Sequence, residues 1–173
     1  MKSGRPKAGE FAEYATSDIE NVAGDDAVEA LRSQSREIVA LLDRVDERSV
    51  AGLAYAPGKW TFKQVIGHLI DDERIFGYRA LCVARREPRP LPGFDEKEYM
   101  KATDFEHRAL ASLKAEYRAV RESSIAFFES LTADEWLRKG EVNGYMASVR
   151  GLAFHICGHE LHHLRTIREK YLT

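Results

Sequence analysis

Four of the six histidines of this 173-residue chain lie in one short segment, HICGHELHH, which runs from His155 to His163. His155, His159 and His163 are four residues apart, so on an α-helix their side chains share one face, whereas His162 faces another side. A metal ion needs ligands that converge on one point, and imidazole is a ligand that zinc, nickel, copper and iron all accept. The spacing therefore predicts that His159 and His163 bind one divalent ion.

The same segment contains H-E-x-x-H, the signature of zinc peptidases, in which Glu160 would be the general base. Such enzymes need a third ligand downstream, and only ten residues follow His163. The extended peptidase pattern would require a turn glycine where this chain has Thr166, and an unbroken helix would carry Glu169 about 9 Å along its axis from His163. We therefore reject the peptidase interpretation and keep Glu160 as a candidate proton carrier beside the metal.

The third ligand must come from elsewhere, and the histidines outside the cluster are His68 and His107. His107 lies among charged residues and is expected to be solvated. His68 lies in VIGHLIDDE, where Gly67 would let another group approach closely and where either Asp71 or Asp72 could orient an imidazole or touch a bound water. Three histidines from two helices leave a coordination position free, which is the catalytic arrangement of zinc rather than the structural one.

The composition excludes several classes of protein. A formal net charge of −2 gives no basic footprint for nucleic acid. No apolar run approaches the roughly 18 to 20 residues of a membrane helix, and no apolar segment follows the basic N-terminus as in a secretory signal. Cys82 and Cys157 form no disulfide framework. We expect one cytoplasmic domain that binds a small-molecule substrate, without a nucleic-acid or membrane partner.

Four segments carry apolar residues at helical spacing and must position these histidines. They span residues 25–45, 62–86, 110–131 and 149–167, and Thr61 with Gln64 forms a capping box before the second. Ser148 is a candidate cap for the last. Residues 1–24 are expected to form an irregular arm that packs on a single bundle domain, residues 25–173.

A proline-rich stretch from Glu87 to Thr103 connects the second and third helices. Its 17 residues exceed the roughly 2 to 8 usual between antiparallel neighbours. Extended chain of this length reaches roughly 50 Å, more than the length of the second helix. We therefore predict an all-α fold, a four-helix bundle in which a long crossover leaves helices two and three parallel.

Two long stretches, GKWTFKQVIGHLIDDERIFGYRAL and SVRGLAFHICGHELHHLRTIREKYL, resemble the DinB-like superfamily, as do RPKAGEFAEY and PLPGF. The resemblance implies a metal-binding four-helix bundle in up-down-down-up order that is often dimeric. The family's histidine in a His-Leu-x-Asp motif and its His-x-x-x-His pair correspond to His68, His159 and His163. Family members often carry glutamine where this chain has Thr166, which leaves any polar contact there open.

The resemblance also implies a function. The understood relatives use zinc to activate low-molecular-weight thiols for S-transfer or isomerisation, and others are regarded as metal-dependent hydrolases. We expect a zinc or nickel ion that activates a thiol or water, since a cation on three neutral histidines lowers the pKa of its bound nucleophile. Asp71 and Glu160 are the candidate proton carriers or orienting groups. A non-enzymatic metal-binding module of a stress response remains an alternative.

Two further expectations concern substrate binding and assembly. An anionic substrate or thiol cofactor could be held by Arg74 and Arg79, or by Arg85 and Arg121. A homodimer is expected, partly from the resemblance and partly from aromatic residues outside the helical stripes that should line the pocket mouth or an interface. These are Phe11, Tyr14, Tyr55, Phe94, Tyr99 and Tyr145.

Overall fold

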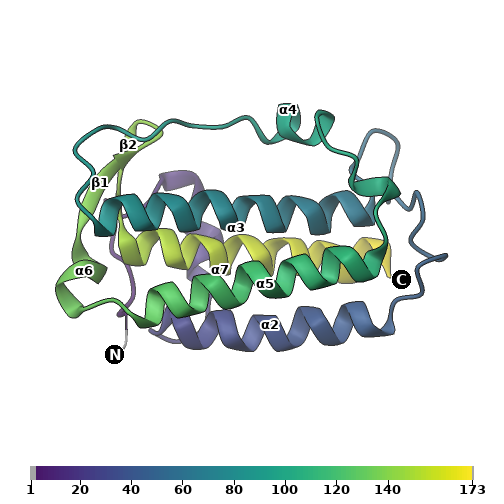
Figure 1. Cartoon of the computed structure of the whole chain (residues 1–173), viewed down its shortest axis with the longest axis horizontal. Helices are drawn as coiled ribbons and strands as arrows, with labels where there is room; N and C mark the ends of the chain where they lie inside the picture. Colours follow the sequence, from purple (N-terminus) through teal and green to yellow (C-terminus); the bar gives the residue numbers. More distant parts are fainter. Residues whose placement is uncertain (1–2, 173) are drawn as a thin grey trace.

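The computed structural model describes residues 3–172, and four long helices make up most of this part of the chain (Figure 1). They are α2 (Ala27–Arg44), α3 (Phe62–Ala84), α5 (Leu110–Glu129) and α7 (Val149–Thr166). Helices α2 and α7 run in one direction, and α3 and α5 run in the other (Figure 1). This up-down-down-up order, with α3 and α5 parallel, confirms the predicted bundle.

The helices begin where the sequence places caps. The Thr61 side chain accepts a hydrogen bond from the Gln64 backbone, and the Gln64 side chain accepts one from the Thr61 backbone, so the predicted capping box is present. The Ser148 side chain likewise accepts from the backbone N–H of Gly151 at the start of α7. Each cap satisfies backbone donors that have no partner within the helix. The two helices that carry the histidines therefore have defined starting points.

The apolar faces of the helices meet in two clusters of buried side chains. Helix α3 packs against α5 and α7, and α2 packs against the same two helices. One part of the core lies around Leu31, Phe76 and Phe154 and the other around Ile66 and Leu113. Full burial of side chains of this size contributes about 1.5 to 3 kcal/mol each. Because α3 and α7 are direct neighbours, His68 can meet the histidines of α7.

The connection from α3 to α5 runs along the outside of the bundle (Figure 1). It is irregular through its prolines and then forms the short helix α4 (Glu96–Lys101), whose cap is the Asp95 side chain, and the 3-10 turn η2 (Phe105–His107). The Phe105 ring lies on Gly67, where a Cβ would come within 2.4 Å of it. The lack of a side chain at Gly67 thus leaves room for Phe105 of the crossover, and not for a ligand. This contact helps to bring α4 over the histidines.

The residues before α2 form an arm that contains the 3-10 turn η1 (Glu13–Ala15) and the helix α1 (Thr16–Glu20). The arm lies against α7 at two glycines, since a Cβ on Gly151 would meet the Glu10 carbonyl at 1.9 Å and one on Gly158 would meet the Asp18 backbone at 2.6 Å. Arg150 also pairs with Glu10 at 2.9 Å. The arm is therefore packed on the helix that carries the histidine pair.

The segment between α5 and α7 completes the fold. It forms the short helix α6 (Ala133–Leu137) and a hairpin of β1 (Lys139–Val142) and β2 (Tyr145–Ser148). The hairpin turn uses Asn143 and Gly144, both at positive φ, as a two-residue turn of this kind requires. After α7 a π-helical turn, η3 (Ile167–Tyr171), continues the helix. No helix within residues 3–172 is long and apolar enough to cross a membrane.

Candidate metal centre

His68 on α3 and the pair His159 and His163 on α7 converge on one point. Nε2 of His159 lies 3.1 Å from Nε2 of His68 and 3.1 Å from Nε2 of His163, and the three ligand atoms lie within 4.8 Å of one another. Two nitrogens that bind one tetrahedral zinc ion at its usual bond length are about 3.3 Å apart. The donor type and the spacing therefore both fit a divalent ion.

A buried carboxylate lies behind this group. Oδ2 of Asp72 is 3.2 Å from Nδ1 of His159 and 3.7 Å from Nε2 of His155. Burial would raise the pKa of Asp72, but His159 and then His155 outweigh it, so the pKa lies below its usual range. An ionised Asp72 holds a proton on Nδ1 of His159 and turns the Nε2 lone pair toward the metal position. Of the two aspartates that could orient an imidazole, the structure selects Asp72.

The other two histidines of the converging group, His68 and His163, are held in the neutral form. Burial lowers the pKa of His68 to about 4, with a further contribution from His159, and it lowers the pKa of His163 further below its ordinary value. For His159, burial acts in the same direction, but Asp72 raises its pKa above the ordinary value. Neutral imidazole is the form that binds a metal ion. The site therefore offers two free nitrogen lone pairs, and His159, which Asp72 orients, would release the proton of its Nε2 when an ion binds.

His155 belongs to the helical column but not to the metal position. Its ring stacks on Phe76 with centroids 3.7 Å apart, and burial lowers its pKa to about 4. Oδ2 of Asp72 lies 3.7 Å from its Nε2. His162 and His107 are exposed and lie near Asp18 and Asp104. The column therefore supplies two of the three converging nitrogens, as its spacing predicted. Its third member, His155, packs against Phe76 instead.

Two residues that the sequence did not identify lie beside the converging nitrogens. Oε2 of Glu96 on α4 is 3.8 Å from Nε2 of His68, and its side chain is half exposed. The Trp60 ring lies 4.8 Å from the His68 ring. The Asp95 cap predicts the start of a helix at Glu96, but only the path of the crossover brings that helix to the site. Glu96 is therefore a half-exposed carboxylate beside His68, although it does not line the pocket at His163.

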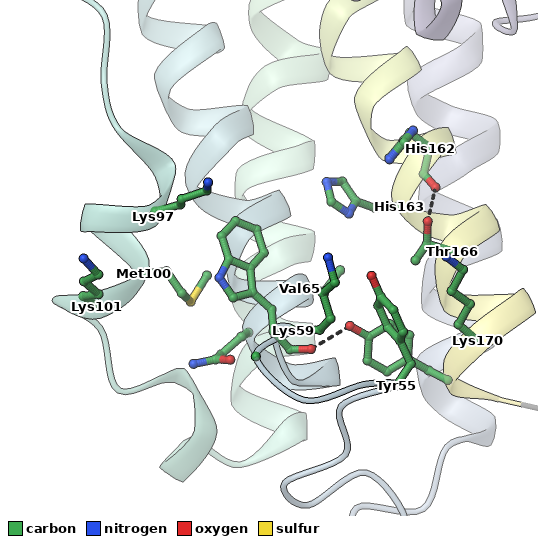
Figure 2. A pocket seen from close by; sticks show the side chains of 14 residues that line it. Tyr55, Lys59, Val65, Lys97, Met100, Lys101, His162, His163, Thr166 and Lys170 are labelled. Atoms are coloured by element: carbon green, nitrogen blue, oxygen red, sulfur yellow. Dashed lines mark hydrogen bonds between the residues drawn. The ribbon is translucent and has the colours of Figure 1, made fainter.

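A pocket of about 790 Å³ opens at His163 (Figure 2). Its walls come from the loop before α3, from α4 and from the end of α7. They are formed by Tyr55, Gly58, Lys59, Trp60, Gln64, Val65, Lys97, Met100, Lys101, His162, Thr166, Lys170 and Tyr171. This volume is within the range of small-molecule sites, about 300 to 1,000 Å³. A small molecule in the pocket would contact a candidate metal ligand directly.

The structure places Glu160 away from this pocket, which corrects the expectation that it carries protons for the metal. Its carboxylate accepts hydrogen bonds from Tyr117 at 2.8 Å and from Arg121 at 2.7 Å. Arg121 also bonds both carboxylate oxygens of Glu73, and it is fully buried. Burial raises the pKa of Glu160, and Arg121 opposes that shift. Glu160 is thus part of a buried ion-pair network between α3, α5 and α7.

Asp71, the other candidate proton carrier, faces α5 rather than the histidines. It lies 3.9 Å from Arg74, and burial raises its pKa while Arg74 opposes the shift. Arg74 itself bonds Glu116 on α5 at 2.5 Å. Neither side chain is among the groups that line the pocket at His163. The expected roles of Asp71 in catalysis and of Arg74 in cofactor binding have no support in this arrangement.

The remaining arginines are also engaged elsewhere. Arg79 is buried, donates to the Pro92 carbonyl at 2.8 Å and lies over the rings of Phe76 and Phe94 at 4.7 and 5.5 Å. It therefore holds the crossover against α3 by hydrogen bonding and cation–π contact. Arg85 pairs with Glu135. The prediction that arginines surround the site is not supported, and the cations beside the pocket are lysines.

Comparison with known proteins agrees with this architecture. The family model of the DinB superfamily matches residues 27–167. No curated protein matches the chain. Among solved structures, YfiT from Bacillus subtilis, described as a probable metal-dependent hydrolase with an unusual four-helix bundle topology, has a TM-score of 0.70 and 18% identity. That similarity covers 95% of this chain and 89% of YfiT. The chain belongs to the DinB superfamily.

Proposed function

We propose that this protein is a metal-dependent enzyme in which His68, His159 and His163 hold one divalent ion, zinc or nickel. The observation that carries the proposal is the convergence of three Nε2 atoms beside a pocket, with Asp72 orienting His159 from behind. Such an ion, when bound, lowers the pKa of a water or thiol that it carries. Three protein ligands leave room for that nucleophile, which distinguishes a catalytic from a structural site.

Hydrolysis is the reaction that the surrounding residues support best. A general base must lie within reach of the nucleophile, and Glu96 is a half-exposed carboxylate 3.8 Å from Nε2 of His68, beside the pocket rather than in its wall. Asp72 is committed to the histidines and Glu160 to Arg121. We assign Glu96 the task of accepting the proton from the attacking water. The fold similarity to YfiT, which is described as a probable metal-dependent hydrolase, is consistent with this reaction.

Transfer of a low-molecular-weight thiol is the second candidate. It is favoured by the pocket volume of about 790 Å³, which is large enough for a thiol and an electrophile together. In that reaction Glu96 would accept the thiol proton. A non-enzymatic role for the ion is less compatible with a pocket that reaches His163, because an ion that only joined α3 and α7 would need no such access.

The test is metal analysis combined with two assays. We expect one divalent ion per chain by elemental analysis, lost in His159→Ala. Metal-loaded protein should hydrolyse esters, amides or phosphoesters, or should consume a thiol in the presence of an electrophile. Glu96→Gln should abolish turnover and retain the ion, whereas Glu98→Gln on the same helix should retain both. A full complement of metal without turnover in either assay would instead support the non-enzymatic module.

A further inference from the structure

The pocket at His163 is strongly cationic in a chain whose net charge is −2. Four of the nine lysines in the sequence line it, and no Asp or Glu is among its described lining residues. Within residues 3–172, Lys59, Lys97 and Lys170 have no ion-pair partner, whereas Lys101 pairs with Glu98 at 2.6 Å. The pocket therefore concentrates uncompensated positive charge next to the candidate metal centre.

These lysines differ from most others in the described chain. Lys63, Lys114 and Lys139 each lie against a carboxylate, with Lys63 2.8 Å from Glu47 and Lys139 3.8 Å from Glu10. An exposed lysine is usually a solvated surface group, and one such residue carries no argument. A group of lysines without carboxylates around one concave surface raises the local potential, because a pocket wall excludes water and focuses the field. That potential would attract an anion.

We propose that this pocket selects substrates that carry an anionic group, a carboxylate or a phosphoryl group, on an apolar or aromatic body. The proposal rests on the proposed function, because it takes the pocket to be the substrate site of the metal centre. The anion would lie between Lys59 and Lys97, and the reactive end of the substrate would point toward His163. The substrate class is thus set by lysines, and not by the arginines that the sequence indicated.

The directions of the side chains support this assignment. Lys59 comes from the loop before α3 and Lys97 from α4, and in Figure 2 both extend inward from different sides of the pocket, whereas Lys101 turns away. Lys170 lies over the Tyr55 ring with its Nζ 4.9 Å from the centroid. Two unpaired ammonium groups from different walls of one pocket both raise its potential for an anion. A charge-assisted hydrogen bond is roughly twice as strong as one between neutral groups.

The rest of the wall provides an apolar surface for the body of the substrate. Tyr55, Trp60 and Met100 line it, and the Trp60 ring also contacts His68 at 4.8 Å between centroids. The Tyr171 hydroxyl donates to the Trp60 carbonyl at 2.6 Å, which ties the loop before α3 to the end of the last helix. The wall is thus held in place before a ligand arrives, which lowers the entropic cost of binding.

The test compares a carboxylate with its own amide, which differ mainly in charge, and adds a second anion with a phosphoryl group. Calorimetric titration at pH 8 would use 4-phenylbutyrate and phenylphosphonate, which has no ester bond to hydrolyse, as anions and 4-phenylbutyramide as the neutral counterpart of the carboxylate. We expect each anion to bind more tightly than the amide, with a preference that weakens in high salt because the lysines are exposed. Lys59→Met and Lys97→Met should each lower anion affinity about 3- to 10-fold and leave amide binding unchanged. The double variant should lose the preference.

Lys7→Met is the matched control. Lys7 is exposed on the arm, has no ion-pair partner within residues 3–172, and its loss changes the net charge by the same amount. Lys59→Arg should retain the preference, and melting curves by circular dichroism should show the variants folded. Equal binding of anions and amide, no binding of either anion, or unchanged anion affinity in the double variant would overturn the proposal.

Titrations before and after chelation separate this proposal from the proposed function. We expect the lysine-dependent preference in both forms, because the ammonium groups act without the ion. A preference that disappears on chelation and ignores the lysine variants would show that the metal alone binds the anion. That result refutes the lysine assignment and leaves the metal centre intact. A lysine-dependent preference in a protein that binds no metal would refute the proposed function and leave the pocket assignment standing.

Discussion

The Asp72 carboxylate lies 3.2 Å from Nδ1 of His159, on the side of the ring that faces away from His68 and His163. Both side chains are largely buried, so water does not screen the pair strongly. The contact fixes the protonated nitrogen of His159 and leaves its Nε2 free to bind an ion. The neighbouring Asp71, about 100° further round the helix, faces α5 and cannot take this role.

Asp72→Asn should weaken metal binding while all three histidines remain. An amide has no charge to hold His159 in its orientation, and loss of such a partner typically costs about 10- to 100-fold in metal affinity. Competition with a chromophoric chelator would measure the change. Asp71→Asn is the matched control and should bind the ion as the natural protein does. If the two variants bind metal equally well, Asp72 has no orienting role.

The metal-free protein should lose stability as the pH falls from about 6.5 toward 4. The pKa values of His68 and His155 are lowered to about 4 in the fold, mainly by burial, and an unfolded histidine titrates near 6.5. In this window the unfolded chain binds more protons, so protonation favours unfolding by up to about 1.4 kcal/mol per pH unit for each histidine. The raised pKa of His159 changes the stability mainly above pH 6.5, where its folded form still binds a proton that the unfolded form has lost, so it offsets the loss only near the upper end of this window.

Urea unfolding of chelated protein at pH 7 and pH 5 would measure the effect. The free energy of unfolding should differ less between pH 7 and pH 5 in His155→Gln, because the contribution of one buried histidine is removed. His155 suits this test because it is buried yet does not take part in the converging group. His107→Gln is the control, since His107 is exposed and its pKa is raised by Asp104. An unchanged pH dependence in His155→Gln would contradict the assignment of a neutral buried ring.

Arg121→Met should destabilise the protein by about 3 to 5 kcal/mol, because it leaves Glu73 and Glu160 without their shared cation in the core. The measurement is chemical denaturation. Arg74→Met removes an ion pair in which Arg74 is half exposed, and should cost no more than about 1 kcal/mol. Similar losses in both variants would mean that the buried network contributes little to stability.

Glu160→Gln separates a structural from a catalytic role for this residue. We expect a lower unfolding free energy with an unchanged metal content, since Glu160 bonds Tyr117 and Arg121 rather than the histidines. No peptidase activity should be present in the natural protein. Metal-dependent cleavage of an unstructured peptide that this substitution abolishes would restore the zinc-peptidase interpretation.

The chain should form a homodimer in solution. Tyr14, Tyr78 and Tyr99 are more than half exposed, whereas Tyr55 lines the pocket. Several exposed aromatic side chains on one protein are typical of a subunit interface. A stable interface buries at least about 1,200 Å² in total. Light scattering at micromolar concentration should give twice 19.6 kDa. Tyr78→Ser with Tyr99→Ser should shift the mass toward the monomer. A solution mass of 19.6 kDa for the natural protein would refute the dimer.

The amino-acid sequence by itself determined the helices and the three histidines. Apolar spacing and the caps at Thr61 and Ser148 are local features, and they depend on backbone geometry that is the same in every α-helix. The pair His159 and His163 follows from the same periodicity. His68 could then be selected because it was the remaining histidine on an apolar face, and the length of the crossover was sufficient to predict the parallel helices.

Only the tertiary structure decided which charged residues surround those histidines. Asp71 and Asp72 are adjacent in sequence, and the packing of α3 between α5 and α7 determines which one meets His159. The same packing turns Glu160 toward Arg121. Glu96 and the pocket lysines reach the site through the path of the crossover. Each of these contacts joins residues far apart in the chain, so it depends on helix rotation and loop course, which local sequence patterns do not encode.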